Sequence, residues 1–192
     1  MALYWESYFQ RASRVQSALV HLSGECEKAA HFFASTLESG GKLIFIGNGG
    51  SASDAQHLAA EFVGRFLADR GPLSAVCLNT DTSVMTAIAN DFGYSHVFAR
   101  QVQGLARSGD VLVAISTSGR SQSIVSALEL ARSLPITTVL LTSRACPIET
   151  RNLCTLTIAV DCDVTAHIQE AHISLGQAIC GRTEQLLLDL SK

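Results

Sequence analysis

The chain has 192 residues, 47% of them hydrophobic and 16% charged, with three prolines; this composition fits one compact globular domain and excludes disordered and collagen-like chains. The 14 basic and 17 acidic residues give a formal net charge of −3, and neither sign gathers into a run that could hold nucleic acid or a membrane surface. No apolar stretch approaches the roughly 20 residues that cross a bilayer, and Glu6 and Gln10 interrupt the segment that a signal peptide keeps apolar. We therefore expect a cytoplasmic protein with neither a membrane nor a nucleic acid as a direct partner.

Two amphipathic helices are predicted at the start of the chain, because apolar residues recur at helical spacing over Tyr4–Leu22 and Cys26–Leu37. Beyond Gly40, short apolar runs alternate with longer helical stretches, which is typical of parallel strands joined by crossover helices. The expected strands are Lys42–Ile46, Leu73–Leu78, Asp110–Ile115, Ile136–Thr142 and Leu156–Val160. A last helix is expected over about Val164–Leu190.

The apolar runs are continuous and show no alternation of apolar and polar residues, so both faces of the sheet should be covered by helices. The fold class predicted is therefore α/β: a single-domain α/β/α sandwich with a parallel sheet of about five strands, preceded by helices. No Pro/Ser-rich linker and no second core divides residues 1–192, so we expect one domain.

Two predicted strands run into similar loops. The strand ending at Ile46 continues into Gly47–Ser53, and the strand ending at Ile115 continues into Ser116–Ser121, each followed by a helix. Both loops lie at the carboxyl ends of parallel strands, where open α/β sheets bind their ligands.

The second loop favours phosphate binding. It gathers four hydroxyls, of Ser116, Thr117, Ser118 and Ser121, around one glycine just before a helix whose first backbone N–H groups lack partners. Hydroxyls and free amides donate hydrogen bonds to a phosphate, and the helix dipole adds to them. The alternative is an ordinary N-cap and turn, but an N-cap needs one such residue and not four.

The first loop carries less information. Gly47, Asn48, Gly49 and Gly50 lack the G-x-G-x-x-G spacing, and no lysine follows as in a P-loop. The glycines permit close approach of the backbone to a ligand.

Within the helix that follows the first loop, His57 and Glu61 are four residues apart and project from one face. Such a pair is often a hydrogen-bonded surface pair. Apolar neighbours and a position next to a ligand loop favour a site instead, in which the pair binds a divalent metal or Glu61 acts as a general base.

Three other groups of polar residues do not indicate a function when each is considered alone. Gln169 and Gln177 lie on neighbouring faces of the last helix, so they either face one cavity or belong to a solvated polar turn. Arg65 and the Asn90-Asp91 pair stand in otherwise apolar segments.

Taken together, these segments resemble the sugar isomerase domain proteins and, among them, the phosphoheptose isomerases. The resemblance runs in order from about Cys26 to Cys180. The matching pieces are Gly47–Ala52, Asp54–His57, Glu61 with Arg65, Leu78–Asp81, Thr86–Asp91, Gly109–Leu112, Ile115–Gly119, and Ile168–Glu170 with His172.

The resemblance implies a flavodoxin-like sandwich that assembles as a homotetramer, with active sites where subunits meet. Residues 1–40 would serve oligomerisation and residues 41–192 would bind the sugar phosphate. The implied reaction interconverts sedoheptulose 7-phosphate and D-glycero-D-manno-heptose 7-phosphate through an enediol, for the heptose of bacterial lipopolysaccharide. It requires a base, an acid and a group that holds the enediolate oxygens.

The resemblance also assigns residues. The implied substrate-binding residues are Asn48, Gly49, Gly50, Ser51, Glu61, Arg65, Asn90, Asp91, Ser116, Thr117, Ser118, Ser121 and Gln169. A zinc ion would lie on His57, Glu61, Gln169 and the residue at position 177. Catalysis would rest on Glu61, as the base, and on position 177.

The chain departs from the family at position 177. The isomerases carry a histidine there as metal ligand and proton-transfer partner, but this chain has Gln177, which does not titrate near neutral pH. One relative of the isomerases also lacks that histidine and works as a tetrameric binding protein for the bacterial replication initiator. Glu61, which a binding protein does not need, favours the enzyme over this alternative.

Overall fold

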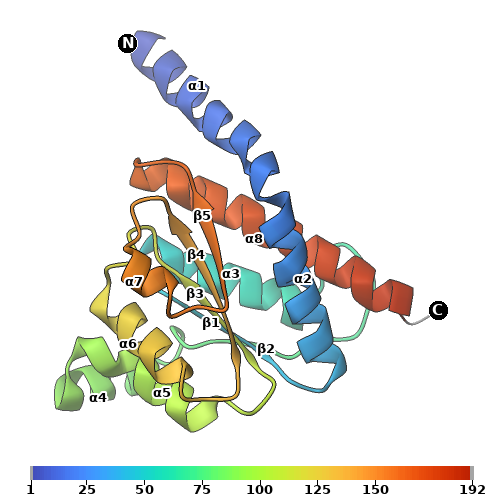
Figure 1. Ribbon diagram of the computed structural model, residues 1–192, viewed down its shortest axis with the longest axis vertical. Helices are drawn as coiled ribbons and strands as arrows, with labels where there is room; N and C mark the ends of the chain where they lie inside the picture. Colours follow the sequence, from blue (N-terminus) through green and yellow to red (C-terminus); the bar gives the residue numbers. More distant parts are fainter. Residues whose placement is uncertain (1, 191–192) are drawn as a thin grey trace.

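The structure is a computed structural model that describes residues 2–190 (Figure 1). Its helices are α1 (Ala2–Ala18), α2 (Ser23–Glu38), α3 (Gly50–Val63), α4 (Thr82–Phe92), α5 (Val97–Leu105), α6 (Gln122–Ala131), α7 (Ile148–Arg151) and α8 (Thr165–Leu190), with 3-10 turns η1 (Leu19–Leu22) and η2 (Tyr94–His96). Its strands are β1 (Leu43–Gly47), β2 (Ala75–Cys77), β3 (Val111–Ile115), β4 (Thr137–Ser143) and β5 (Leu156–Val160).

The five strands form one parallel sheet in the order β2-β1-β3-β4-β5. β1 and β3 are neighbours, and their register pairs Gly47 with Ile115. The two loops that the sequence singles out therefore leave adjacent strands at the same level of the sheet. This places them side by side at its carboxyl edge, as parallel pairing requires.

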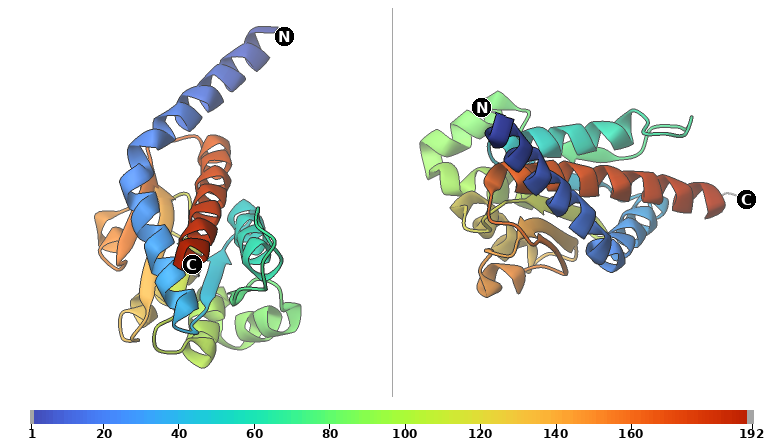
Figure 2. Two further views of the ribbon diagram at one scale, coloured as in Figure 1. Left: turned by 90° about the vertical axis from the view of Figure 1, so that its right-hand side faces the viewer. Right: turned by 90° about the horizontal axis from the view of Figure 1, so that it is seen from above.

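Helices cover both faces of the sheet, because alternate residues of each strand point to opposite sides. Leu43 and Phe45 pack under α2, α3 and α8, whereas Ile44 and Ile46 pack with α5 and α6 on the other side (Figures 1 and 2). The predicted α/β/α sandwich of about five parallel strands is confirmed.

The N-terminal helices extend beyond this sandwich. α1 continues through η1 into α2: the end of the first predicted helix is the 3-10 turn Leu19–Leu22, and residues 23–25, expected between the two helices, are the first turn of α2. The outer part of α1 projects past the sheet layers (Figures 1 and 2). Its inner side contacts α8, where Tyr8 Oη donates to Glu170 Oε1 at 3.0 Å and the Tyr8 ring lies 4.5 Å from that of His167.

Two further segments differ from expectation. The strand expected over Leu73–Leu78 is reduced to the three residues of β2, which is an edge strand and pairs only with β1. No helix is singled out by the sequence pattern over residues 82–92, which form α4; none of these residues is buried, and Met85, Ile88 and Ala89 pack only partly buried against the core on the α5 and α6 side. Within residues 2–190 no helix has the length and apolar character to span a membrane.

Candidate active site

The loop between β1 and α3 is shaped by three glycines. Gly49 has φ +57°, which favours glycine, and a Cβ on Gly47 would lie 2.2 Å from the carbonyl oxygen of Ser51. A Cβ on Gly50 would lie 2.3 Å from Gln169 Nε2. The absence of a side chain at Gly50 thus lets Gln169 of α8 reach the loop, so the structure brings these two expected site residues together.

The Asn48 side chain is held from both ends. Its Nδ2 donates to Ser123 Oγ at 2.9 Å, and its Oδ1 accepts from Tyr94 Oη at 2.7 Å. Asn79, two residues after β2, fixes the backbone of Gly47 next to Asn48, because its Oδ1 accepts from Gly47 N at 3.2 Å and its Nδ2 donates to Gly47 O at 2.7 Å. Sequence reasoning gave no role to Asn79, Ser123 or Tyr94.

The hydroxyl loop lies on the neighbouring strand, β3. Ser116 Oγ accepts from Gly119 N and Ser118 Oγ accepts from Arg120 N, each at 3.2 Å. Each of these hydroxyls still has its own hydrogen to donate. Within the described chain Ser121 caps α6 without a side-chain hydrogen bond, so its hydroxyl is free to donate to a ligand.

Gly119 is fixed in this loop by two residues that sequence reasoning missed. It has φ +63°, and a Cβ there would lie 2.1 Å from Cys146 Sγ. Its carbonyl accepts from Thr150 Oγ1 at 3.0 Å. Both contacts come from the segment after β4, about 30 residues further along the chain.

His57, Glu61 and Gln177 meet between α3 and α8. His57 Nε2 lies 2.9 Å from Glu61 Oε1 and 3.2 Å from Gln177 Nε2, and the side chains of His57 and Glu61 are 47% and 21% exposed. The helices approach closely here, since a Cβ on Gly176 would lie 2.5 Å from Leu58 Cδ1. A carboxylate beside an imidazole, open to solvent, can accept a proton from a ligand.

A neighbouring carboxyl on α3 is unusual. Burial raises the pKa of Asp54, and the nearby His57 offsets this only in part. Asp54 Oδ2 is buried and has no hydrogen-bond partner among the described residues.

The remaining expected residues lie apart from these contacts. Asn90 Nδ2 donates to Asp91 Oδ1 at 2.8 Å at the exposed end of α4, and within residues 2–190 neither side chain bonds to another site residue. Arg65 is exposed just after α3. A single chain therefore assembles the two loops and the His57 cluster, and leaves Arg65, Asn90 and Asp91 at its surface.

Comparison with known proteins decides the family. The SIS domain family model matches residues 7–143. Phosphoheptose isomerase from Akkermansia muciniphila is 47% identical over 168 residues, which cover 88% of each chain. The chain belongs to the phosphoheptose isomerase family of SIS-domain proteins. A second member, from a Bradyrhizobium strain, is 51% identical over 156 residues, covering 81% of this chain and 78% of the relative.

Solved phosphoheptose isomerases have the same fold. The chain is similar to the enzyme GmhA from Neisseria gonorrhoeae with a TM-score of 0.89 and 37% identity, over 96% of this chain and 98% of that one. It is similar to a Francisella tularensis phosphoheptose isomerase with a TM-score of 0.91 and 32% identity, over 96% and 99% of the two chains.

The zinc ion that this family implies does not fit the donor set of this chain. Zinc in proteins is normally held by at least three side chains drawn from cysteine, histidine and carboxylates. His57 and Glu61 are two such ligands, whereas positions 169 and 177 offer amides. The structure of residues 2–190 contains no group of three histidine, cysteine or acidic side chains that could hold a metal ion. Gln169 also lies beside Gly50, eight residues or about 12 Å along α8 from Gln177.

Proposed function

We propose that the protein is an aldose–ketose isomerase that interconverts sedoheptulose 7-phosphate and D-glycero-D-manno-heptose 7-phosphate. The observation that carries the proposal is the contact of Glu61 with His57 at 2.9 Å on the helix that follows the glycine loop, in a chain 47% identical to a phosphoheptose isomerase over 88% of its length. Following the resemblance, the proposal includes that the reaction takes place in the cytoplasm and supplies heptose for bacterial lipopolysaccharide.

The phosphate end of the substrate would bind at the hydroxyl loop. The loop precedes α6, a helix of 10 residues, so the free N–H groups of its first turn add to the hydroxyls of Ser116, Thr117, Ser118 and Ser121. The pairing of Gly47 with Ile115 puts the glycine loop next to this anion site. Asn48 also contacts Ser123 of α6 at 2.9 Å, so a sugar phosphate bound at the hydroxyl loop would extend over the glycine loop.

The proposed chemistry moves one proton between two carbons. Glu61 removes a proton from C1 of the ketose, the electron pair forms an enediolate, and the proton returns to C2. The C1 hydroxyl gives up its proton as C1 becomes the aldehyde, and the C2 oxygen takes up one proton, either that one or one from solvent. His57, hydrogen-bonded to Glu61, stabilises the carboxylate in the orientation that accepts the proton. Gln177 can donate a hydrogen bond to an enediolate oxygen but cannot exchange a proton.

This scheme routes no step through zinc, because the chain is one strong ligand short of an ordinary zinc site. The resemblance still favours a metal bound near His57 and Glu61. Metal content of the purified protein, measured together with activity, tests whether the two strong ligands suffice.

The proposal includes self-association. The side chains of Tyr4, Trp5 and Phe9 on the projecting α1 are more than half exposed. Such a group of exposed apolar side chains is typical of a protein–protein interface. A homotetramer that covers these side chains, with sites where subunits meet, agrees with the resemblance. Light scattering is expected to give about four times the 20.4 kDa of one chain, and a monomeric mass would contradict it.

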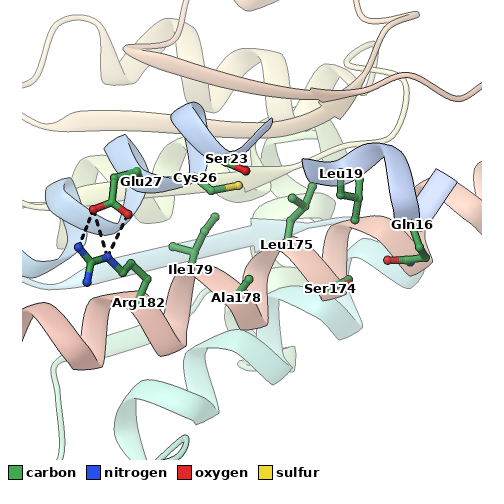
Figure 3. A pocket seen from close by; sticks show the side chains of 10 residues that line it. All are labelled: Gln16, Leu19, Ser23, Cys26, Glu27, Ser174, Leu175, Ala178, Ile179 and Arg182. Carbon is green, nitrogen blue, oxygen red and sulfur yellow. Dashed lines mark hydrogen bonds and ion pairs between the residues drawn. The ribbon is translucent and has the colours of Figure 1, made fainter. Parts of the chain in front are cut away.

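A groove lies at the base of α1, where Gln16 is one of its lining residues (Figure 3). It has a volume of about 400 Å³ and lies between η1 with α2 and the middle of α8. Leu19, Leu175 and Ile179 line it, and an ion pair of Arg182 with Glu27, at 2.8 Å, lies at one end. An apolar groove at the base of a helix that carries exposed aromatic side chains supports assembly through this part of the molecule.

Exchange of the carbon-bound hydrogens tests the function. In deuterated water, sedoheptulose 7-phosphate incubated with the protein is expected to gain deuterium at C1, and the aldose formed is expected to carry it at C2, because the enediol exposes the transferred proton. Protein that binds the sugar phosphate without any exchange would contradict the isomerase. It would favour the binding-protein alternative that Gln177 suggests.

A further inference from the structure

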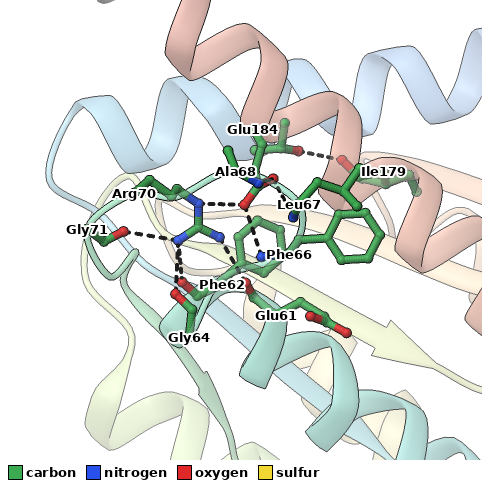
Figure 4. Close-up of polar contacts among 11 residues, drawn as sticks. Glu61, Phe62, Gly64, Phe66, Leu67, Ala68, Arg70, Gly71, Ile179 and Glu184 are labelled. Atoms are coloured by element: carbon green, nitrogen blue, oxygen red, sulfur yellow. Dashed lines mark hydrogen bonds and ion pairs between the residues drawn. The ribbon is translucent and has the colours of Figure 1, made fainter.

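A buried ion pair joins α8 to the loop after α3 (Figure 4). Arg70 Nε donates to Glu184 Oε1 at 2.7 Å, and the two side chains are 8% and 3% exposed. Buried ion pairs add little net stability, since the loss of hydration opposes the attraction of the charges. The pair also forms hydrogen bonds with backbone groups of the loop after α3 and of the last turn of α3.

Glu184 holds three consecutive amides. Its two carboxylate oxygens accept from the backbone N–H groups of Phe66, Leu67 and Ala68, at 3.1, 3.0 and 3.1 Å. Burial raises the pKa of Glu184, but these three N–H groups and the charge of Arg70 together outweigh burial and lower it. The carboxylate is therefore ionised at neutral pH, and the loop is wrapped around it.

Arg70 holds the end of α3. The last carbonyls of an α-helix have no partner within the helix, and a cation there is favoured by the helix dipole. Arg70 Nη2 donates to the carbonyl oxygen of Glu61 at 2.8 Å, and Nη1 donates to those of Phe62 at 2.9 Å and Gly71 at 3.0 Å. The guanidinium is thus bonded to the backbone of the residue that we propose as the base.

We propose that Arg70 and Glu184 are a positioning pair that sets Glu61 in the active site and orients the exposed Arg65, which the resemblance assigns to the substrate, an inference that rests on the proposed function. Glu61 belongs to the last turn of α3, and Arg65 lies between that turn and the amides that Glu184 holds. Glu184 follows Gln177 on α8 by seven residues, or two turns. The pair therefore fixes the position of Glu61 relative to α8, the helix that carries Gln177. It does so through the backbone and without contact with the substrate.

The experiment compares Glu184→Gln with a matched control, Asp110→Asn. Asp110 is also a buried carboxylate, at 2% exposure, and it pairs with Lys42 Nζ and accepts from the backbone N–H groups of Lys42 and Arg107, at 2.9 and 2.7 Å. It precedes β3, at the amino edge of the sheet, opposite the proposed site. Both variants thus weaken a buried ion pair and its hydrogen bonds to backbone N–H groups. Only Glu184→Gln does so beside the end of α3, where Glu61 lies.

Rates are measured below the melting temperature of each variant, so that all the protein is folded. A misplacement of about 1 Å costs about 100-fold in rate, so Glu184→Gln is expected to lower kcat by about 10- to 100-fold and to raise KM as Arg65 shifts. Asp110→Asn is expected to lose thermal stability but to keep kcat and KM within about twofold. Wild-type kcat and KM in folded Glu184→Gln would overturn the positioning pair.

Substitutions of Arg70 provide a second, independent test, which can be carried out even if Glu184→Gln does not fold. Arg70→Gln is expected to lose kcat in the same way. Arg70→Lys, which keeps the charge but not the planar fork, is expected to recover part of it. Equal activity of wild type and both variants would contradict the proposal.

A further arm separates this inference from the proposed function. Absence of exchange at C1 and C2 in the wild type would refute the isomerase alone. Crystal structures of the wild type and Glu184→Gln then decide about the pair: Glu61 displaced by about 1 Å supports it, and Glu61 unmoved against His57 overturns it.

Discussion

The proposed phosphate loop depends on the glycine at position 119, and Gly119→Ala is expected to damage both stability and phosphate binding. The residue has φ +63°, where an L side chain costs about 1 to 2 kcal/mol. A Cβ there would also lie 2.1 Å from Cys146 Sγ and 3.0 Å from Cys146 Cβ. Relieving such overlap in a packed region costs a further 1 to 3 kcal/mol, roughly. The expected loss is therefore about 2 to 5 kcal/mol.

The two contributions can be separated with Cys146→Ala, which removes the sulfur atom but leaves φ unchanged. In that background Gly119→Ala is expected to cost about 1 to 2 kcal/mol, because most of the overlap is gone. Urea unfolding of the four proteins at one protein concentration measures these differences. Titration calorimetry with the sugar phosphate should show weaker binding by Gly119→Ala, since the loop must move.

Two results would refute this reasoning. A stability change below about 0.5 kcal/mol would show that the loop adapts to a side chain at little cost. An equal cost of Gly119→Ala with and without the Cys146 sulfur would show that the overlap is not its cause.

Four further outcomes are expected. Glu61→Gln should slow deuterium exchange at C1 by at least about 100-fold and leave the Kd for the sugar phosphate nearly unchanged, because the base acts in the transition state; unchanged exchange would show that another group is the base. Gln177→His should tighten zinc binding measured by calorimetry, since it adds a third strong ligand, and equal affinity would contradict the site. Replacing Ser116 and Ser118 by Ala should weaken sugar-phosphate binding by about 1 to 3 kcal/mol, and unchanged affinity would place the phosphate elsewhere. The stability difference between wild type and Glu184→Gln, followed by urea unfolding, should be full above pH 4.5 and shrink as pH falls, because the pKa of Glu184 is lowered in the fold; a difference independent of pH would contradict an ionised carboxylate.

The sheet could be predicted because its signal is local. Leu43–Ile46 and Val111–Ile115 are continuous apolar runs, and each is buried on both faces. The hydroxyl loop can be recognised for the same reason, since its four hydroxyls lie within six positions of the chain, and its role in phosphate binding stays a prediction.

The supports of the site could not be predicted, because they join residues far apart in the chain. Ser123 is 75 residues from the Asn48 that it holds, and Glu184 is 114 residues from Arg70. No local pattern distinguishes these side chains from ordinary polar ones. Tyr94 is a different case, because it lies on an exposed turn that sequence periodicity does not describe.

The parallel run of α3 and α8 constrains the chain in a further way. Gly50 faces Gln169, and His57 faces Gln177, so the contacts recur at nearly equal intervals along both helices. Each residue advances an α-helix by about 100° and 1.5 Å. One residue inserted between positions 169 and 177 would turn one glutamine away from α3 while the other stayed in place. Throughout the family this interval should therefore accept substitutions but keep its length, whereas the loop between β5 and α8 is free to vary in both.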